Sequence, residues 1–196
     1  MAITHNFLKE LHRLGRTINK LTCGQARLEI PDDEERTFYF YITPDDGYYK
    51  GSTCKFKVDV PEEYPEEPPL VRCLNKIYHP NIDFESEPIE AAVCVNLLDA
   101  DWQPGVGLDG CVMAVLFLFH NPNTEDALNP VFRGSQMDEQ EFEENVRKSL
   151  KGEEVEGFVF DKLINEELDL VTNVQMNDKL INEKPDLVTN VHMNEK

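Results

Sequence analysis

Three short runs of alternating apolar and polar residues constrain the fold of this chain more than any other feature of its sequence. They cover residues 26–30, 38–42 and 54–60, and in each run every second side chain is apolar. A period of two puts those side chains on one face of a β-strand, so each run predicts a half-buried strand. The segment PDDG at 44–47 predicts a turn between the second and third runs. With a fourth strand at 70–73, connections this short favour a four-stranded antiparallel meander.

Helical periodicity flanks the predicted meander. Residues 7–20 carry an apolar stripe at positions 7, 11, 14 and 18, a spacing that predicts an amphipathic helix. Residues 108–119 are apolar on nearly every side, which predicts a helix buried in the core. Residues 142–150 repeat apolar side chains every four positions, with acids before them and basic residues at the end, which favours another helix. The sequence therefore predicts an α+β fold with an N-terminal helix, a four-stranded antiparallel meander, an irregular segment and C-terminal helices.

Length and an internal repeat divide the chain into two regions. A length of 196 residues fits one ordinary domain with an appendage. Residues 161–177 and 178–194 form a tandem duplication in which 14 of 17 positions are identical. Two copies are too few for a solenoid, and Pro185 breaks any helix shared by the copies. We therefore expect a folded core over residues 1–160 and an acidic tail over 161–196 that is partly helical or disordered.

Composition excludes several classes of protein. The chain has 19 Lys and Arg against 38 Asp and Glu, a net charge of −19, and such a field repels nucleic acids and anionic membranes. The longest apolar run, at 111–119, has nine residues, whereas a membrane-spanning helix needs about twenty. The first residues lack an apolar signal core, so we expect an intracellular protein of the cytoplasm or nucleus. The five cysteines form no CxxC pair, which argues against a disulfide framework or a cysteine zinc site, so we expect no metal.

Charge is distributed unevenly along this acidic chain. The first twenty residues contain Lys9, Arg13, Arg16 and Lys20 against Glu10 alone. A basic helix on an acidic protein favours a docking face for an acidic partner. A helix face that is merely solvated is the alternative.

The irregular middle of the chain contains the residue types of a thiol site. It holds HPN at 79–81, VCVNLL at 93–98 and DWQP at 101–104, and the predicted buried helix then leads to NPNTEDALN at 121–129. A cysteine, a histidine, an asparagine and an aspartate on irregular backbone beside a rigid sheet form a candidate thiol site. Taken singly, each of these side chains is also compatible with a purely structural role.

From its first helix to about residue 160, the chain resembles the ubiquitin-conjugating (carrier) enzyme family. The matching features follow one another in the family's order: the basic helix, the meander, PDDGYYKG, YPEEPP, HPN, VCVNLL, DWQP and NPNTEDALN. Within the family, the strings TPDDGYYKG, YHPNID, CVNLL with DWQP, and ENVRKSLKG followed by FVFDKL are similar to the neddylation branch.

The resemblance implies an enzyme that carries a ubiquitin-like modifier, of the neddylation type first and ubiquitin next. Cys94 matches the cysteine that accepts the modifier as a thioester from an activating enzyme, before transfer to substrate lysines with a ligase. Asn81 matches the family's asparagine, for which stabilisation of the oxyanion and ordering of the active-site loop both remain open. Asp126 falls where the family places an acid that orients the incoming lysine and helps remove its proton, with a solvated loop acid as the alternative. His79 matches a structural histidine and is not assigned as a base.

The resemblance also implies partner surfaces. Lys9, Arg13 and Arg16 lie on the helix that the family presents to its activating enzyme. The residues in the two loops that face RING-type ligases are Pro65, Glu66, Trp102, Pro104 and Gly105. Trp102 is expected to serve as a core anchor as well. ATP is used by the activating enzyme, so we expect no cofactor on this chain, and we expect a monomer.

Two departures from the family keep an alternative open. Asn81 and Cys94 are thirteen positions apart, several more than is usual, because FESEPIEAA replaces a tight turn. Few residues precede the first helix, where the neddylation branch carries a docking extension. A diverged, catalytically inactive copy that binds ligases as an adaptor or competitor is therefore the alternative. A cysteine hydrolase is a poor third interpretation, since no orienting acid with a recognisable motif accompanies His79.

Overall fold

The computed structural model describes residues 2–84, 91–93, 96–132 and 138–164. Its contacts divide the chain into two units, Met1–Ile164 and Asn165–Lys196. The first unit contains, in chain order, α1 (Ala2–Leu21), β1 (Ala26–Glu29), β2 (Thr37–Ile42), β3 (Cys54–Asp59), β4 (Leu70–Cys73), β5 (Ile82–Asp83), β6 (Ala91–Val93), the 3₁₀ turn η1 (Asn96–Leu98), α2 (Gly107–His120), the 3₁₀ turn η2 (Pro130–Phe132), α3 (Glu139–Leu150), β7 (Glu154–Val155) and β8 (Phe158–Val159). Of the tail expected over 161–196, residues 161–164 belong to the first unit. Residues 165–196 lie outside the described residues, so the expectation for them stays a prediction.

The predicted antiparallel meander is confirmed, and the sheet extends beyond it. Strands β1 to β4 pair in sequence order, with Phe40 opposite both Leu28 and Phe56. Two short strands continue the sheet, giving the order β1-β2-β3-β4-β6-β5. They lie in the segment for which the sequence predicted irregular backbone. Strands of two and three residues are too short to show a period-two pattern, which is why the sequence did not indicate them.

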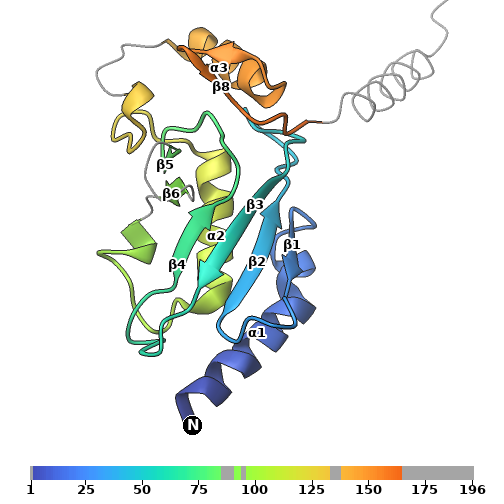
Figure 1. Ribbon diagram of the computed structural model, residues 1–196, viewed down its shortest axis with the longest axis vertical. Coiled ribbons are helices and arrows are strands. Elements are labelled where there is room, and N and C mark those ends of the chain that lie inside the picture. Colours follow the sequence, from blue (N-terminus) through green and yellow to red (C-terminus); the bar gives the residue numbers. More distant parts are fainter. Residues whose placement is uncertain (1, 85–90, 94–95, 133–137, 165–196) are drawn as a thin grey trace, which may run out of the picture. The chain divides into compact units, whose positions relative to one another are not determined.

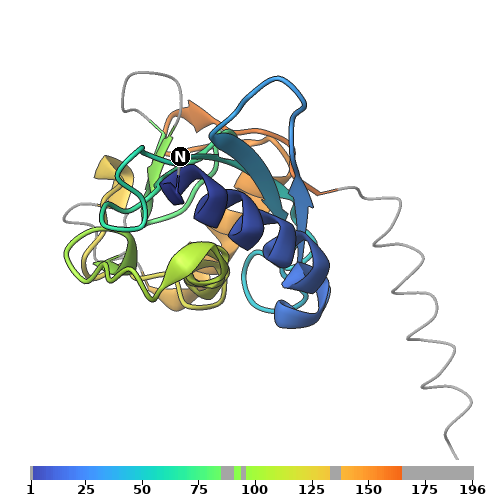
Figure 2. The same ribbon diagram turned by 90° about the horizontal axis from the view of Figure 1, so that it is seen from below.

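The helices α1 and α2 complete the core with the sheet (Figures 1 and 2). The predicted apolar stripe of α1 is buried along its whole length, from Phe7 to Ile18. Most of α2 is also buried, as predicted, but Met113 and Phe117 remain 37% and 62% exposed. The prediction that nearly every face of this helix is buried was therefore wrong for these two residues. An apolar side chain on an all-apolar helix carries no periodic signal that separates its inner from its outer face. Among the described helices, none is both long and apolar enough to cross a membrane.

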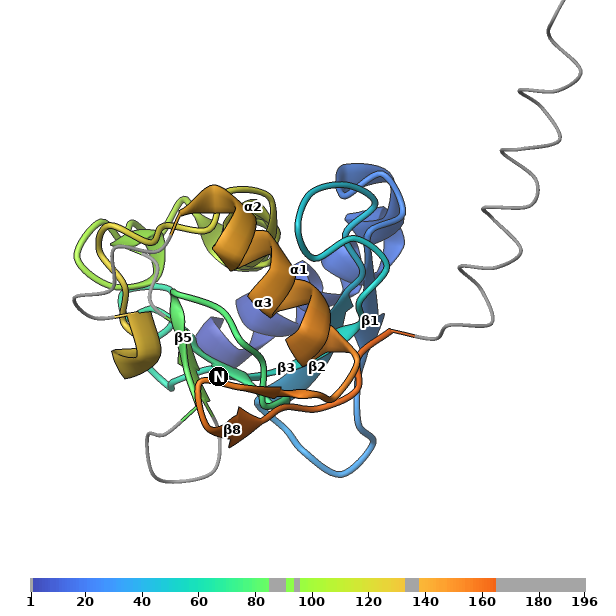
Figure 3. The same ribbon diagram turned by 90° about the horizontal axis from the view of Figure 1, so that it is seen from above.

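Helix α3 and the hairpin of β7 and β8 lie at the end of this unit opposite the N-terminus (Figures 1 and 3). The side chain of Asp138 caps α3 by accepting a hydrogen bond from the backbone N–H of Glu141 at 2.8 Å. The last described residues return to the core, because Leu163 N donates to Leu150 O at 2.9 Å and Thr53 N donates to Leu163 O at 3.0 Å.

His79 is part of this core and is fully buried. Its ring centroid lies 4.8 Å from that of Tyr49 and 5.2 Å from that of Phe119. Nδ1 accepts a hydrogen bond from Asn81 N at 3.0 Å, so Nε2 carries the proton and donates it to Leu118 O at 3.2 Å. Burial lowers the pKa of His79 to about 3, because a charged imidazolium would lose its hydration. The ring is therefore a neutral structural group, in agreement with the family resemblance.

The buried neutral His79 makes folding sensitive to acid. Its pKa is about 3 in the folded chain and near 6.5 in the unfolded chain, so below pH 6.5 the unfolded state binds more protons. As the pH falls from 6.5 to 3, this histidine alone lowers the free energy of unfolding by about 1.4 kcal/mol for each pH unit. We expect His79→Asn, whose Oδ1 replaces the Nδ1 acceptor, to lose this slope. In urea denaturation at pH 7 and pH 5, the stability gap between wild type and variant should shrink by about 2 kcal/mol at the lower pH. An equal gap at both pH values would contradict the assignment.

Candidate active site

The segment HPN at 79–81 is fixed to the C-terminal half of α2. The hydrogen bond from His79 to Leu118 O joins the segment to the helix, and the bond from Asn81 N to His79 shapes its turn. The position of the residues that follow this turn is therefore fixed by α2.

The side chain of Asn81 is bound to the backbone of the loop that follows α2. Asn81 Nδ2 donates to Asn123 O at 3.1 Å, and Asn123 N donates to Asn81 Oδ1 at 2.9 Å. Both polar atoms of the amide thus engage a single residue, and Asn81 is only 3% exposed. In this geometry the amide is bonded to the backbone of the 121–129 loop.

Two further asparagines hold the same loop, and sequence reasoning did not single them out. Asn129 is fully buried, and its Nδ2 donates to His79 O at 3.3 Å and to Ile82 O at 3.1 Å. Asn123 Oδ1 accepts from Glu125 N at 3.1 Å and Asp126 N at 3.2 Å. The three asparagines of NPNTEDALN were the available signal, because an asparagine can bond to backbone on either side of a turn.

Asp126 is exposed and stands at the rim of a groove of about 580 Å³. Residues lining this groove include Asn81, Leu97, Met113, Phe117, Asn123 and Asp126. The lining combines polar residues of the asparagine-bonded loop with the two exposed apolar side chains of α2, Met113 and Phe117. The structure therefore brings Asn81 and Asp126 to one groove.

Cys94 lies outside the described residues. Its chain neighbour Val93 pairs with Ile82, and Ala92 pairs with Asp83, in the antiparallel ladder of β5 and β6. Ile82 is the residue that follows Asn81. The additional residues between Asn81 and Cys94 are therefore contained between two paired strands.

The buried thiols of the chain are poor nucleophiles. Cys54, Cys73 and Cys111 are buried and unpaired. Burial raises the pKa of Cys54 well above its usual value and raises the pKa of both Cys73 and Cys111 to about 12. Because the thiolate is the reactive form, these three groups are unreactive at neutral pH. Cys23 is exposed, in the turn between α1 and β1.

The residues of the predicted partner surfaces lie at or near the surface. Lys9, Arg13 and Arg16 are exposed on α1, and Arg13 forms an ion pair with Asp109 at 3.2 Å. Of the loop residues, Glu66, Pro104 and Gly105 are exposed, whereas Pro65 and Trp102 are half-buried. Trp102 Nε1 donates to Pro65 O at 3.0 Å, so the tryptophan both packs against the core and connects the two loops. Among the described residues, no cluster of three or more His, Cys, Asp or Glu is arranged to hold a metal ion.

Comparison with known proteins gives a consistent result. The family model described as "Ubiquitin-conjugating enzyme" matches residues 8–150. The NEDD8-conjugating enzyme ubc12 of Schizosaccharomyces pombe is 45% identical over 124 residues, which cover 63% of this chain and 67% of that protein. The NEDD8-conjugating enzyme UBC12 of Kluyveromyces lactis is 43% identical over 158 residues, or 79% of this chain and 83% of that protein. The solved structure of S. cerevisiae Ubc12 matches with a TM-score of 0.62 and 34% identity, covering 71% of this chain and 74% of that chain.

These matches confirm the fold and the neddylation-type resemblance indicated by the ordered motifs. The family model spans most of the chain, and both relatives exceed 40% identity. The chain therefore belongs to the ubiquitin-conjugating enzyme family.

Proposed function

We propose that this enzyme carries a NEDD8-type modifier as a thioester on Cys94 and transfers it to substrate lysines. The observation that carries the proposal is the 43% identity to a NEDD8-conjugating enzyme over 158 residues, a span that includes most of the folded core. The comparisons give no support to the inactive adaptor that the sequence left open.

The proposed chemistry consists of two acyl transfers. The Cys94 thiolate attacks the thioester between modifier and activating enzyme, forms a new thioester and releases the activating enzyme's cysteine as a thiolate. A substrate lysine amine then attacks that carbonyl, an isopeptide bond forms, and Cys94 leaves as the thiolate. The proton of the attacking amine passes to a nearby base or to water.

The β5–β6 ladder supports Cys94 despite the longer spacing from Asn81. Val93 is paired with Ile82, and one peptide unit separates consecutive Cα atoms by about 3.8 Å. Val93, the residue before Cys94 in the sequence, is therefore held beside the turn that contains Asn81.

Asn81 and Asp126 have different proposed roles in the transfer to lysine. The paired hydrogen bonds with Asn123 support Asn81 as the residue that orders the loop. That loop carries Asp126, whose backbone is fixed by Asn123 and whose side chain is exposed at the groove. We propose that the Asp126 carboxylate orients the incoming lysine ammonium group and assists its deprotonation as a positioned general base.

The apolar lining of the groove supports a contact with the modifier itself. Met113 and Phe117 are both exposed, lie one helical turn apart on α2 and line the same groove, and contiguous exposed apolar side chains are typical of an interaction surface. The modifier is tethered to the adjoining active site, so its effective concentration at this surface is high. We propose that an apolar patch of the modifier packs on Met113 and Phe117.

The remaining expectations belong to the same proposal. The activating enzyme docks on the basic face of α1, and a RING-type ligase contacts the loops at 64–66 and 102–105. The chain works as a monomer in the cytoplasm or nucleus, without a metal or cofactor of its own, and ATP is consumed by the activating enzyme.

A charging assay tests the central proposal. Incubation with ATP, NEDD8 and its activating enzyme should give an adduct that is visible on a non-reducing gel and disappears with reducing thiols. Cys94→Ala should give no adduct, whereas Cys94→Ser should give an ester that resists thiols, because an alkoxide is a poorer leaving group than a thiolate. Parallel reactions with ubiquitin and its activating enzyme determine which modifier is preferred. A folded wild-type sample that forms no adduct with either modifier would overturn the proposal.

Removing the Asn81 amide tests its role in ordering the loop. Asn81→Ala deletes both hydrogen bonds to Asn123, and we expect transfer to free lysine to slow by roughly a hundredfold through misplacement of the loop. Faster hydrogen exchange at Asn123 N–H should accompany the loss. Thr124→Ala, in the same loop, serves as the control. A slow variant with unchanged exchange would instead favour a direct oxyanion role.

Truncation of Phe117 separates function from stability. Because this ring is largely exposed, Phe117→Ala should change the free energy of unfolding by less than about 0.5 kcal/mol. Phe119→Ala, in the same helix but fully buried, should cost about 3–5 kcal/mol. We expect Phe117→Ala to slow discharge of the NEDD8 thioester about tenfold with a normal melting temperature. Wild-type discharge by this variant would exclude the proposed contact.

A further inference from the structure

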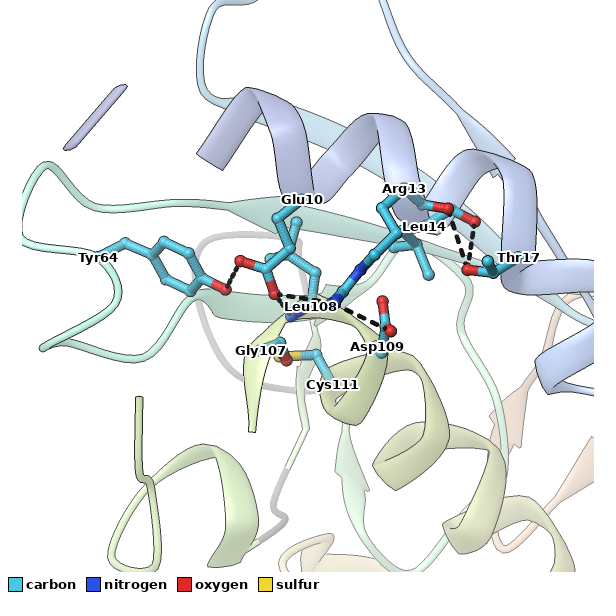
Figure 4. A network of polar contacts seen from close by, with 9 residues as sticks. All are labelled: Glu10, Arg13, Leu14, Thr17, Tyr64, Gly107, Leu108, Asp109 and Cys111. Carbon is cyan, nitrogen blue, oxygen red and sulfur yellow. Dashed lines mark hydrogen bonds and ion pairs between the residues drawn. The ribbon is translucent and has the colours of Figure 1, made fainter. Parts of the chain in front are cut away.

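The carboxylate of Glu10 joins three elements that lie far apart in the sequence. Glu10 belongs to α1, and its side chain is only 16% exposed. It accepts a hydrogen bond from Tyr64 Oη at 2.7 Å and another from Leu108 N at 2.8 Å (Figure 4). Tyr64 directly precedes Pro65 in one loop, and Leu108 lies in the first turn of α2, directly after the other loop. One half-buried carboxylate therefore connects both loops to α1.

This carboxylate replaces a cap that α2 lacks. Val106, at the N-cap position, makes no side-chain capping bond. The first amides of a helix have no intrahelical acceptor and carry partial positive charge, so a nearby anion stabilises them. Glu10 supplies that anion from a different helix. The start of α2, and the loop leading into it, are thereby fixed to α1.

Gly107 leaves the space that Glu10 occupies. A Cβ at position 107 would overlap Glu10 Oε1, and the φ of 63° at this glycine is unfavourable for other residues. A side chain at this position would therefore force the Glu10 carboxylate to shift (Figure 4). This provides a second way to break the connection without altering Glu10.

The two loops are also bound to one another beside this carboxylate. The ring centroids of Tyr64 and Trp102 are 6.1 Å apart, and Trp102 Nε1 donates to Pro65 O. Trp102 is the single tryptophan of the chain, so its fluorescence reports directly on this contact. Arg13 also contacts this network: its Nη2 lies 3.8 Å from Glu10 Oε1 and 3.2 Å from Asp109 Oδ2.

We infer that Glu10 is a positioning residue for ligase-stimulated transfer. Through Tyr64 it holds the loop at 64–66, and through Leu108, at the start of α2, it holds the loop at 102–105, at the spacing that a RING-type ligase binds. The inference rests on the proposed function, which assigns those loops to the ligase. Since Glu10 acts through the loops, its loss weakens the affinity for the ligase and leaves the thiol chemistry unchanged.

The test compares three rates in the full chain: charging by the NEDD8 activating enzyme, discharge to free lysine, and discharge with the RING domain of a neddylation ligase. For Glu10→Ala, charging and free discharge should stay within about twofold of wild type, while the KM for the RING domain rises about tenfold. Glu10→Gln should recover part of the affinity, because its amide oxygen still accepts from Leu108 N. Glu35→Ala, an exposed glutamate between β1 and β2, is the matched control and should behave as wild type.

Two further variants make the test specific to the network. Tyr64→Phe removes one bond to Glu10 and keeps the ring, and combined with Glu10→Ala it should add no further loss, because both act on one connection. Gly107→Ala should reproduce the defect of Glu10→Ala. Trp102 emission should shift in both Glu10→Ala and Gly107→Ala, with an unchanged helical circular dichroism signal.

The outcomes separate this inference from the proposed function. If the wild type charges and responds to the RING domain, and the variants show an unchanged KM for that domain, the inference about Glu10 is overturned while the proposed function stands. An equal fall of all three rates with a lowered melting temperature would reduce Glu10 to a structural residue and also overturn it. A wild type that does not charge would overturn the proposed function, and the inference with it.

Discussion

Packing of α2 against the β-meander determines where every part of the candidate site lies. Phe119 of α2 places its ring centroid 6.0 Å from that of Phe56 and 5.3 Å from that of Tyr49, in edge-on contacts. Buried aromatic pairs of this kind contribute both apolar area and a preferred geometry. The HPN segment is bonded to the same helix through His79, and the 121–129 loop continues from its last turn. A displacement of α2 along the sheet would therefore move both sides of the groove.

Much of the fold can be predicted from local patterns. The strands at 37–42 and 54–59 and the buried stripe of α1 were predicted almost to the residue, because one buried face imposes a strict period on a strand or helix. The motif order around Cys94, Asn81 and Asp126 indicated the family, and the comparisons confirm it. Both kinds of prediction depend on information that is contiguous in the sequence or ordered along it.

The features that could not be predicted depend on contacts between distant residues. Glu10 and Leu108 are 98 positions apart, and no local pattern marks a glutamate that caps another helix. Asn129 bonds to His79 and Ile82, about fifty positions earlier, so its importance emerges only when the loop is placed. The exposure of Phe117 was missed for the opposite reason, since α2 is apolar on both its inner and outer faces. Hydrogen bonds between residues far apart in the sequence depend on the tertiary structure and leave no local pattern. Sequence periodicity, in contrast, indicates only which side chains are buried.

The pairing of Ile82 with Val93 has an evolutionary consequence. In an antiparallel ladder, the distance between two paired residues is set by their hydrogen bonds. It does not depend on the number of residues in the connection between the strands. Codons can therefore be gained or lost between the two strands while the pairing beside Asn81 is kept. The length of such a connection can drift between lineages without a change in the register of the strands that it joins.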